Sequence, residues 1–340
     1  MNDQAHELRN LVRHSVAGDV ARLLRRSRWV LLTSGKGGTG TTTVALNLAV
    51  ALAGRHHRTV LVDADPQGGS IGLLCRLRAH YTLADVLSGG RCLPEILQPG
   101  PGGIEVIPGA GSLEQRGTQG AVAPQWLISQ LESLDARADV IVIDGGNGLS
   151  RFVLQGWPHC DVGVVITTPD AAAIMNSYAL MKILMGPRGG VLPRCLVNFA
   201  PSAAVAEDVQ ARIAGACARF LALRPTAFGH LSADPAIAAA GQAAESFVLA
   251  APRSEAARQT DRLAEAVMAA ASGRQSAAAP HTAMEAIHVR MSACSNADGT
   301  AARSNLPVGQ ADLRSVAGAL PKLELTPFSA EELFQEQSRK

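Results

Sequence analysis

The chain has 340 residues, of which 47% are hydrophobic and 18% are charged, and its formal net charge at pH 7 is +2. This composition predicts a folded protein with a large core, and it argues against a disordered chain and against a generally basic nucleic-acid coat. The longest apolar run, residues 44–54, is too short to span a bilayer and contains Asn47. The polar N-terminus has no hydrophobic signal core. Six scattered cysteines without metal or redox spacing complete the expectation of a cytoplasmic protein with reduced thiols.

The first 28 residues predict an amphipathic helical arm. Apolar residues recur every three or four positions, which gives one apolar stripe: Ala5, Leu8, Val12, Val16, Val20 and Leu23. The rest of the arm is cationic: Arg9, Arg13, Arg22, Arg25, Arg26 and Arg28. By its pattern alone, the arm is either a solvated helix that packs loosely on the domain or a helix that docks on a partner.

Between residues 29 and 271, short apolar runs alternate with helical segments. The predicted strands are residues 29–33, 59–62, 140–143, 162–166 and 195–197. The later predicted helices are residues 171–185, 203–221 and 254–271. This alternation predicts an α/β domain with a doubly wound, mostly parallel sheet covered by helices on both faces. Such sheets bind their ligands beyond the carboxyl ends of the strands.

Residues 272–340 differ in composition, because Ala, Ser, Pro, Asn and Gly dominate without periodicity. We expect them to form a disordered tail. Within the tail, Phe328, Ser329, Glu332 and Leu333 fit a hydrophobic staple around a capping box, which predicts a short acidic helix over residues 329–337. The alternative is a coincidental match in an unstructured segment. The predicted organisation is thus an arm (1–28), a core domain (29–271) and a tail (272–340).

A glycine-rich loop follows the first predicted strand and opens a helix, with the sequence Ser34, Gly35, Lys36, Gly37, Gly38, Thr39, Gly40, Thr41, Thr42, Thr43. Glycines allow backbone N–H groups to approach phosphate oxygens, and the helix N-terminus adds its positive end. The loop is therefore a predicted phosphate site. Gly35, Gly37 and Gly40 also satisfy the G-x-G-x-x-G fingerprint, with Asp63 at a suitable distance for a ribose, so a dinucleotide is one candidate ligand.

Three features favour a nucleoside triphosphate with magnesium. Lys36 lies inside the loop in a chain with only four lysines, and a compact ammonium group suits phosphate. Thr42, at the start of the helix, offers a hydroxyl for Mg²⁺. Asp63, Asp65 and Asp144 add carboxylates at the ends of two further strands, as a hydrated metal requires.

The loop resembles the deviant P-loop of the MinD/ParA group of ATPases, whose pattern is K-G-G-x-G-K-[ST]-T. The resemblance implies that Lys36 is the signature lysine, which reaches the nucleotide of a partner subunit in an ATP-dependent homodimer. It implies that Thr42 is a magnesium ligand and that Thr43 is a further phosphate contact. All the residues from Gly35 to Thr43 are then part of the nucleotide site.

The same resemblance extends to three later strand ends. Asp63 and Asp65 resemble the first switch of the family, where the second aspartate positions the attacking water. Asp144 resembles the Walker B aspartate, and Asn198 resembles an asparagine that recognises the adenine base. The implied metal ligands are thus Thr42, Asp63 and Asp144, and the implied catalytic residues are Lys36, Asp65 and Asp144.

Two further segments resemble one branch of the group, the flagellar-number regulators (FlhG, FleN or YlxH). Residues 167–182 resemble the T-T-P-E…Y-A-L-x-K block of that branch. Residues 3–9 resemble its D-Q-A-x-x-L-R motif, which stimulates a signal-recognition-type GTPase (FlhF). The implied partner-binding residues are Asp3, Gln4, Ala5, Leu8 and Arg9. The branch implies control of flagellar number and placement, flagellar switch proteins as further partners, and recruitment to the membrane or cell pole through a partner.

The sequence departs from the family pattern at Thr41, which replaces the second loop lysine. Losing one charge-assisted hydrogen bond to phosphate costs roughly 1.5–3 kcal/mol, or about ten- to a hundredfold in affinity. We therefore expect ATP binding with slow turnover. The alternatives are a pseudo-ATPase scaffold, a ParA-like positioning ATPase that grips DNA, and a dinucleotide oxidoreductase.

A second departure concerns the C-terminus, where relatives often carry a basic amphipathic helix that lies on lipid. Here the predicted terminal helix contains Glu331, Glu332 and Glu336, which anionic lipid would repel. We expect membrane contact to be indirect at most, and no specific nucleic-acid partner.

Overall fold

The computed structural model describes residues 27–66, 69–78, 81–110, 124–186 and 190–277. Residues 1–26 of the predicted arm, with the proposed partner-binding positions, lie outside the described residues. So does the tail beyond residue 277, including the predicted helix at 329–337.

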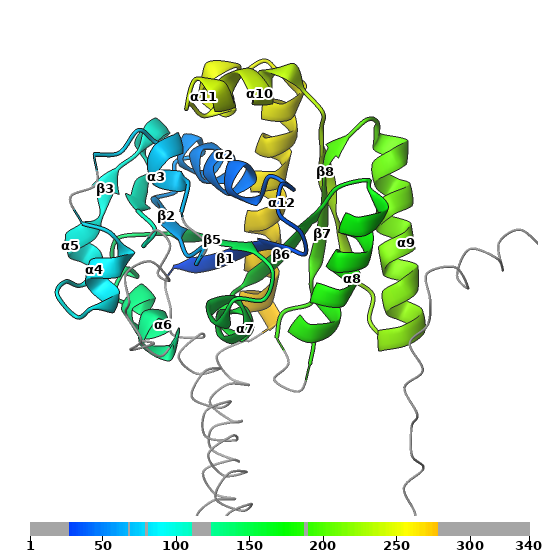
Figure 1. The fold of residues 1–340 in the computed structure, drawn as a ribbon, viewed down its shortest axis with the longest axis horizontal. Helices are drawn as coiled ribbons and strands as arrows, with labels where there is room; N and C mark the ends of the chain where they lie inside the picture. Colours follow the sequence, from blue (N-terminus) through cyan, green and yellow to red (C-terminus); the bar gives the residue numbers. More distant parts are fainter. Residues whose placement is uncertain (1–26, 67–68, 79–80, 111–123, 187–189, 278–340) are drawn as a thin grey trace, which may run out of the picture. The chain divides into compact units, whose positions relative to one another are not determined.

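The described residues form one eight-stranded sheet with the strand order β3-β4-β2-β5-β1-β6-β7-β8 (Figure 1). The strands are β1 Arg28–Ser34, β2 Thr59–Asp63, β3 Gln98–Pro99, β4 Glu105–Ile107, β5 Val140–Asn147, β6 Val162–Thr167, β7 Arg194–Ala200 and β8 Thr226–Ser232. Every neighbouring pair is parallel except the short edge pair β3–β4. The predicted mostly parallel α/β sheet is confirmed.

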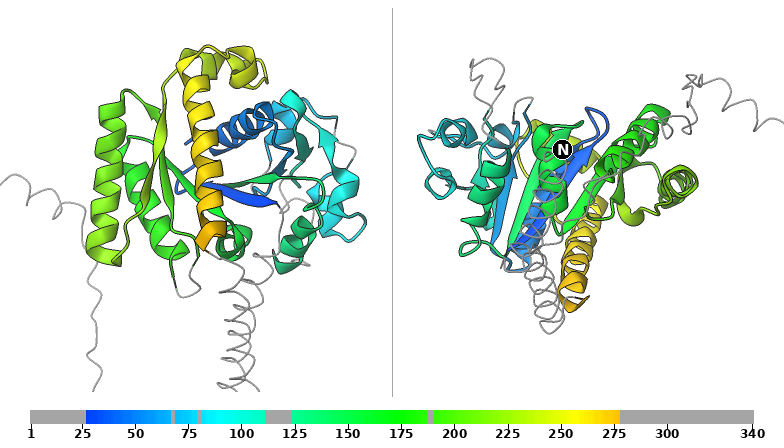
Figure 2. Two further views of the ribbon diagram at one scale, coloured as in Figure 1. Left: turned by 180° about the vertical axis from the view of Figure 1, so that it is seen from behind. Right: turned by 90° about the horizontal axis from the view of Figure 1, so that it is seen from below.

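Helices cover both faces of this sheet (Figure 2). They are α2 Thr41–Gly54, α3 Ile71–Leu74, α4 Leu83–Leu87, α5 Leu93–Ile96, α6 Pro124–Glu132, α7 Arg151–Gly156, α8 Ala171–Leu184, α9 Ala203–Leu221, α10 Pro235–Gln242, α11 Phe247–Ala250 and α12 Glu255–Ala277, with short 3-10 turns η1 Pro101–Gly103 and η3 Trp157–His159. Seen from behind in Figure 2, α12 runs across the sheet. Among these described elements, none is a helix of the length and apolarity needed to cross a membrane.

Alternate residues of β1 belong to two different cores. Trp29 and Leu31 pack in a cluster with residues of α6, α7, α8 and α9, whereas Val30 and Leu32 pack with residues of α2 and α12. A strand buried on both faces needs apolar side chains at every position, because successive side chains point to opposite faces. This explains why the strands were visible in the sequence as continuous apolar runs.

The last helix continues beyond the predicted end at residue 271. The prediction ended the helix where the composition changes, but α12 runs to Ala277. The Ser272 hydroxyl donates to the Met268 carbonyl oxygen at 2.9 Å, which keeps this polar side chain bonded within the helix. The predicted helix end at residue 271 is therefore too early.

The register of the sheet brings the predicted site residues to one edge, which is formed by the carboxyl ends of the central strands. Parallel strands have their carboxyl ends on the same side of the sheet. Asp63 at the end of β2 is the register partner of Asp144 on β5. Ser34, at the end of β1, is the register partner of Asn147. The phosphate loop and the two carboxylates thus emerge from neighbouring central strands.

Trp157 packs on one face of the sheet, against β6. Its side chain is fully buried, and its indole N–H donates to the Val191 carbonyl oxygen at 3.0 Å. A methyl group added at Gly163 would lie 2.5 Å from the indole ring, and one at Gly190 would lie 2.7 Å from it. The two glycines leave the space that the ring fills, so Trp157 is a packing residue.

We expect Trp157→Ala to lower the free energy of unfolding by about 3–5 kcal/mol, because it removes a fully buried aromatic ring and leaves a cavity. Urea denaturation measures the change. Leu73→Ala is the control, since Leu73 is 75% exposed and its loss should cost no more than about 0.5 kcal/mol. Equal effects of the two substitutions would contradict this packing role.

Candidate functional site

The loop between β1 and α2 has the backbone of a phosphate cradle. Gly38 and Gly40 have φ angles of 80° and 84°, in the left-handed region that favours glycine. Gly40 is the N-cap residue of α2 and provides no side-chain cap for the first N–H groups of the helix. Lys36, Gly37 and Gly38 are exposed. An uncapped helix N-terminus behind exposed glycines is suited to bind an anion.

Hydroxyl groups hold this loop from the inside. The Thr41 hydroxyl donates to Ser34 Oγ at 2.9 Å, and Ser34 Oγ donates to the Lys36 carbonyl oxygen at 3.1 Å. Thr39 Oγ1 donates to the same carbonyl oxygen at 3.2 Å. Ser34, Thr39 and Thr41 are all buried. The residue that replaces the family lysine therefore braces the loop, while Thr42 and Thr43 are partly exposed beside it.

The first residues of the loop rest on α8. A methyl group at Gly35 would lie 2.4 Å from the backbone carbonyl carbon of Asn176, so the chain can approach this closely only as glycine. Lys36 Nζ forms an ion pair with Asp170 Oδ1 at 3.0 Å. Asp170 also accepts the Ala173 N–H as the N-cap of α8. The loop and the start of α8 are thus linked by packing and by charge.

The Lys36–Asp170 pair is accessible to solvent, with 44% and 45% of the two side chains exposed. The Thr168 hydroxyl, the Ala173 N–H and Lys36 together lower the pKa of Asp170 to about 2. Exposed pairs contribute little to stability and exchange partners readily. Lys36 is therefore held within its own chain by a contact that a stronger anionic partner can displace.

Asp63 and Asp144 form a buried carboxylate pair, with exposed fractions of 1% and 0%. Asp63 accepts the Ile71 N–H at 3.2 Å and the Asp65 N–H at 3.4 Å. Asp144 Oδ1 accepts the Gly146 N–H at 3.0 Å, but its Oδ2 is buried without a hydrogen-bond partner. A buried carboxylate oxygen without a donor is costly unless a cation approaches it.

Burial shifts both of these carboxylates toward their neutral forms. Desolvation, followed by the charge of Asp144, raises the pKa of Asp63 to about 7. Desolvation raises the pKa of Asp144 to about 6, against the opposing effects of the Thr42 hydroxyl and the Gly146 N–H. A divalent cation between these groups would favour ionisation of both.

The donor set fits magnesium. Among the described residues there is no group of three or more His, Cys, Asp or Glu side chains that is arranged for a metal ion. Mg²⁺ does not require one, because it usually takes one or two carboxylates together with phosphate oxygens and water. Thr42, Asp63 and Asp144 supply a hydroxyl and two carboxylates beside the phosphate loop, and Asp144 Oδ2 is the orphaned atom that such an ion would satisfy.

Asp65 is also brought to this edge of the sheet. A methyl group at Gly146 would lie 2.3 Å from Asp65 Cγ, so the carboxylate rests against the backbone of β5. Gly146 has a φ of 67°, which leaves glycine as the favoured residue there. Asp65 therefore lies next to the Asp144 strand end.

Asn198 has a different environment from the one implied by the family resemblance. Its side chain is 2% exposed, its Nδ2 donates to the Thr39 carbonyl oxygen at 2.8 Å, and its Oδ1 accepts the Phe199 N–H at 2.9 Å. Both ends of the amide are thus bonded, and Asn198 braces the phosphate loop. A contact with an adenine base would require the amide to exchange partners.

Three residues of this site had no role in the sequence interpretation. Asp170 was matched to the family block without a function, and only the folded chain places its carboxylate beside Lys36. Ser34 is a bracing hydroxyl that only the folded loop reveals. Asn147 lies at the end of β5, and a methyl group at Gly37 would lie 3.7 Å from its Nδ2. The register that pairs Asn147 with Ser34 was not readable from sequence.

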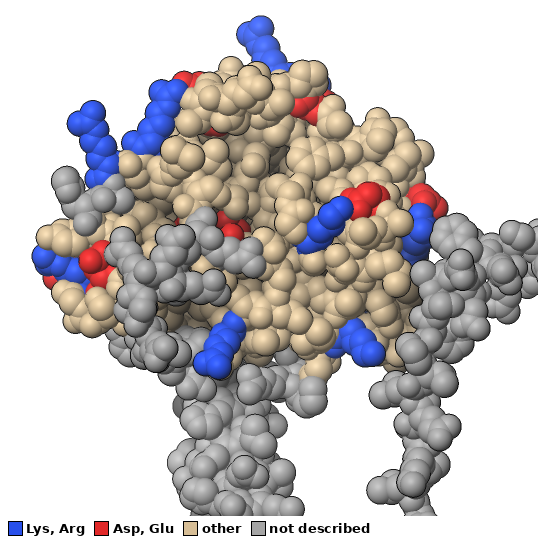
Figure 3. All heavy atoms as spheres, viewed as in Figure 1, with Lys and Arg blue, Asp and Glu red and all other residues tan. Residues whose placement is uncertain are grey.

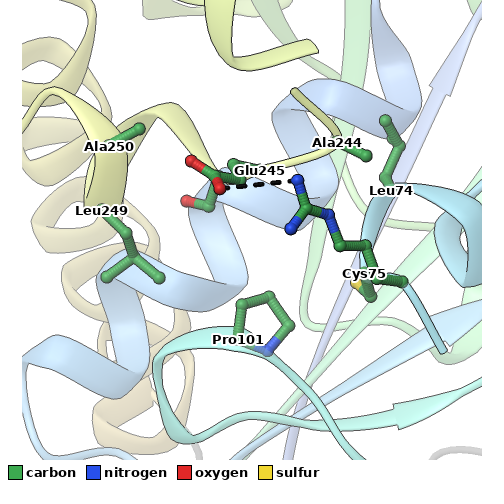
Figure 4. A pocket seen from close by; sticks show the side chains of 9 residues that line it. Leu74, Cys75, Pro101, Ala244, Glu245, Leu249 and Ala250 are labelled. Carbon is green, nitrogen blue, oxygen red and sulfur yellow. Dashed lines mark ion pairs between the residues drawn. The ribbon is translucent and has the colours of Figure 1, made fainter. Parts of the chain in front are cut away.

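A separate cavity of about 280 Å³ lies at α3, η1 and the segment between α10 and α11 (Figure 4). Arg76 and Glu245 form an ion pair at 3.6 Å in its wall. Ser246, also in the wall, donates to Asn47 Oδ1 at 2.7 Å. The residues that line the cavity include none of the loop or of the carboxylate pair, so it is not part of the phosphate site.

The surface charge gives no support for a basic binding face on the side seen in Figure 3. Among the residues described there, Lys and Arg side chains are scattered and do not merge into a continuous basic patch. Non-specific binding to nucleic acid depends on many clustered phosphate contacts.

We expect Asp63→Asn to stabilise the ligand-free protein at about pH 8 and to lose this effect by about pH 4. Between 3.8 and about 7, folded Asp63 retains a proton that the unfolded chain releases, so its contribution to the free energy of unfolding falls as the pH rises. The expected gain above the folded pKa is about 2–4 kcal/mol. Thermal melts from pH 4 to pH 8 measure it.

Asp208→Asn is the matched control, because Asp208 is an exposed carboxylate on α9 whose ion pair with Arg212 is 3.8 Å long. It should leave the pH profile of the melting temperature unchanged. Parallel pH profiles of the melting temperature for wild type and Asp63→Asn would show that ionisation of buried Asp63 does not destabilise the protein.

Comparisons with known proteins find relatives that bind nucleotides. The family model "CobQ/CobB/MinD/ParA nucleotide binding domain" matches residues 30–191. The antiactivator FleN of Pseudomonas aeruginosa is 30% identical over 227 residues, which are 67% of this chain and 81% of FleN. The flagellum site-determining protein YlxH of Helicobacter pylori is 29% identical over 184 residues, which are 54% of this chain and 62% of YlxH. The match thus spans less than two thirds of YlxH.

Solved structures show the same fold at lower identity. The cell division ATPase MinD of Pyrococcus furiosus is 24% identical with a TM-score of 0.59, over 71% of this chain and 98% of that chain. The MinD of Pyrococcus horikoshii, solved in complex with Mg-ADP, has the same identity and TM-score over 71% of this chain and 96% of its own. The chain therefore belongs to the CobQ/CobB/MinD/ParA family of nucleotide-binding proteins, in the branch of flagellar-number regulators that includes FleN and YlxH.

Proposed function

We propose that this protein binds Mg-ATP in the loop 34–43, dimerises over it, and regulates flagellar number and placement as an ATPase with slow turnover. The observation that carries the proposal is the orphaned Oδ2 of Asp144, buried beside the uncapped N-terminus of α2. Identity to FleN and YlxH supports the flagellar role. Family membership favours a nucleoside triphosphate over the dinucleotide that the glycine pattern also allows.

Each residue of the site has a role in this proposal. The backbone of Gly35 to Thr43 holds the phosphates, and Thr42, Asp63 and Asp144 hold the magnesium ion. The ion, when bound, supplies positive charge that neutralises the transferred phosphate group. Asp65, resting on Gly146, positions the attacking water.

Lys36 couples nucleotide binding to dimerisation. In this chain it is paired with Asp170, and the pair is exposed and weak. Contact with the partner subunit's nucleotide would exchange one carboxylate for a more highly charged group. The Lys36–Asp170 pair thus keeps the lysine positioned at the surface until a second subunit arrives.

The arm of residues 1–28 is proposed to dock on a signal-recognition-type GTPase of the FlhF kind through Asp3, Gln4, Ala5, Leu8 and Arg9. Flagellar switch proteins are proposed as further partners. Through one of these partners the protein would be recruited from the cytoplasm to the membrane or the cell pole.

A second candidate function is a pseudo-ATPase scaffold, and Thr41 is the observation that favours it. Its hydroxyl is buried and donates to Ser34, so it offers no charge to the phosphates. In this case partners would bind in response to nucleotide occupancy without turnover.

We expect wild type to bind Mg-ATP and dimerise, Thr41→Lys to bind ATP about ten- to a hundredfold more tightly, and Lys36→Ala to bind without dimerising. Calorimetry, light scattering and phosphate release measure the three properties. Phosphate release by Thr41→Lys alone identifies wild type as the scaffold. A wild type that neither binds ATP nor dimerises rules the proposal out.

We expect Gln4→Ala to reduce stimulation of the GTPase partner by about tenfold, as the loss of an interface hot spot does. The assay is GTP turnover by the purified partner in the presence of the full-length chain. Asn10→Ala, a nearby amide outside the motif, is the matched control and should stimulate normally. Unchanged stimulation by Gln4→Ala would remove the arm from the proposed interface.

A further inference from the structure

Asn147 occupies the point where β5 meets the phosphate loop. It is the register partner of Ser34, and the next residue, Gly148, donates its N–H to the Ser34 carbonyl oxygen at 2.8 Å. This hydrogen bond continues the sheet to the start of the loop. The backbone of Asn147 is therefore positioned by two central strands.

The side-chain amide of Asn147 lies over the exposed middle of the loop. A methyl group added at Gly37 would have Asn147 Nδ2 at 3.7 Å and Asn147 Cγ at 3.9 Å as its nearest neighbours. Gly37 is exposed, and Asn147 is partly exposed. An amide N–H donor thus lies beside the loop residues whose backbone would face the phosphates.

The proposed metal and water residues also lie near Asn147. Asp144 lies three residues before Asn147 on β5. Asp65 rests against Gly146, the residue before Asn147. Asn147 is therefore near Gly37 and is the chain neighbour of the glycine that Asp65 contacts. In the proposed complex this is the end of the site nearest the terminal phosphate, because the magnesium ion and the attacking water both act on that group.

The loop lacks the lysine that would donate hydrogen bonds to the terminal phosphates in the proposed complex. Thr41 replaces the lysine that holds the β- and γ-phosphates in the family, and its hydroxyl is already bonded to Ser34. Lys36 is paired with Asp170. A neutral amide can supply a hydrogen bond to a phosphate oxygen, although without the charge of an ammonium group.

We propose that the Asn147 side-chain amide donates a hydrogen bond to the γ-phosphate of bound ATP, partly replacing the lysine that is absent at Thr41. This inference rests on the proposed function. It makes Asn147 a residue that distinguishes ATP from ADP, since ADP has no oxygen at that position. It would allow the site to recognise a triphosphate without the charge of that lysine.

The test measures the affinities of the full-length chain for Mg-ADP and for a non-hydrolysable Mg-ATP analogue by calorimetry. Asn147→Ala should weaken binding of the ATP analogue about five- to tenfold and change ADP binding by less than about twofold. Asn147→Asp keeps the shape and adds a negative charge, so it should weaken the ATP analogue further, by more than about tenfold. Thermal melts of the ligand-free variants establish that they are folded.

A double-mutant cycle with Thr41→Lys provides an independent test. If the amide and the introduced lysine serve the same phosphate, Asn147→Ala should cost less than about twofold in the Thr41→Lys background. Equal losses for ATP and ADP, no loss for either, or full additivity with Thr41→Lys would overturn the role of Asn147 while leaving the proposed function intact. A wild type that binds neither nucleotide would overturn both.

Discussion

Two carboxylates buried side by side, one at the end of β2 and one within the neighbouring parallel strand β5, are the constraint on which the rest of this site depends. Asp63 and Asp144 are register partners in β2 and β5, and neither is accessible to solvent. Burial raises both pKa values, and one oxygen of Asp144 has no hydrogen-bond donor. An arrangement that costs folding free energy in the absence of a ligand is typical of a functional site, because the bound cation offsets the cost.

The phosphate loop is stabilised by neutral groups. Hydroxyl groups of Ser34, Thr39 and Thr41 hold its interior, and the Asn198 amide bonds the Thr39 carbonyl oxygen. This network keeps the loop in place without a cation at its centre. The site therefore combines a preorganised backbone with few fixed positive charges.

The contacts of the loop also link the nucleotide site to other surfaces. Gly35 contacts the backbone of Asn176 on α8, and Lys36 pairs with Asp170 at the N-cap of that helix. On the opposite side, Asn47 on α2 joins the Thr43 carbonyl oxygen to Ser246 near α11. Such short chains of buried polar contacts are the physical means by which occupancy of one site can bias a distant element.

Much of this protein was predictable from sequence because the features concerned are local. Continuous apolar runs predicted the central strands, glycine spacing predicted the loop, and residues such as Asp63 and Asp144 followed their strands directly. The predicted fold is confirmed, and the phosphate loop and the carboxylates lie together as the strand order requires. The predicted helix end at residue 271 was wrong, because α12 continues to Ala277 past the point where the composition changes.

Only the tertiary structure decided which side chains meet across the sheet. That Lys36 pairs with Asp170, that Asn198 braces Thr39, and that Asn147 lies over Gly37 all depend on strand register and on close backbone approaches. These contacts join residues more than a hundred positions apart in the chain, as the Lys36–Asp170 pair does. Sequence specified the chemistry available at each strand end, whereas register and packing decided which groups face one another, because pairing between distant strands is a property of the whole sheet.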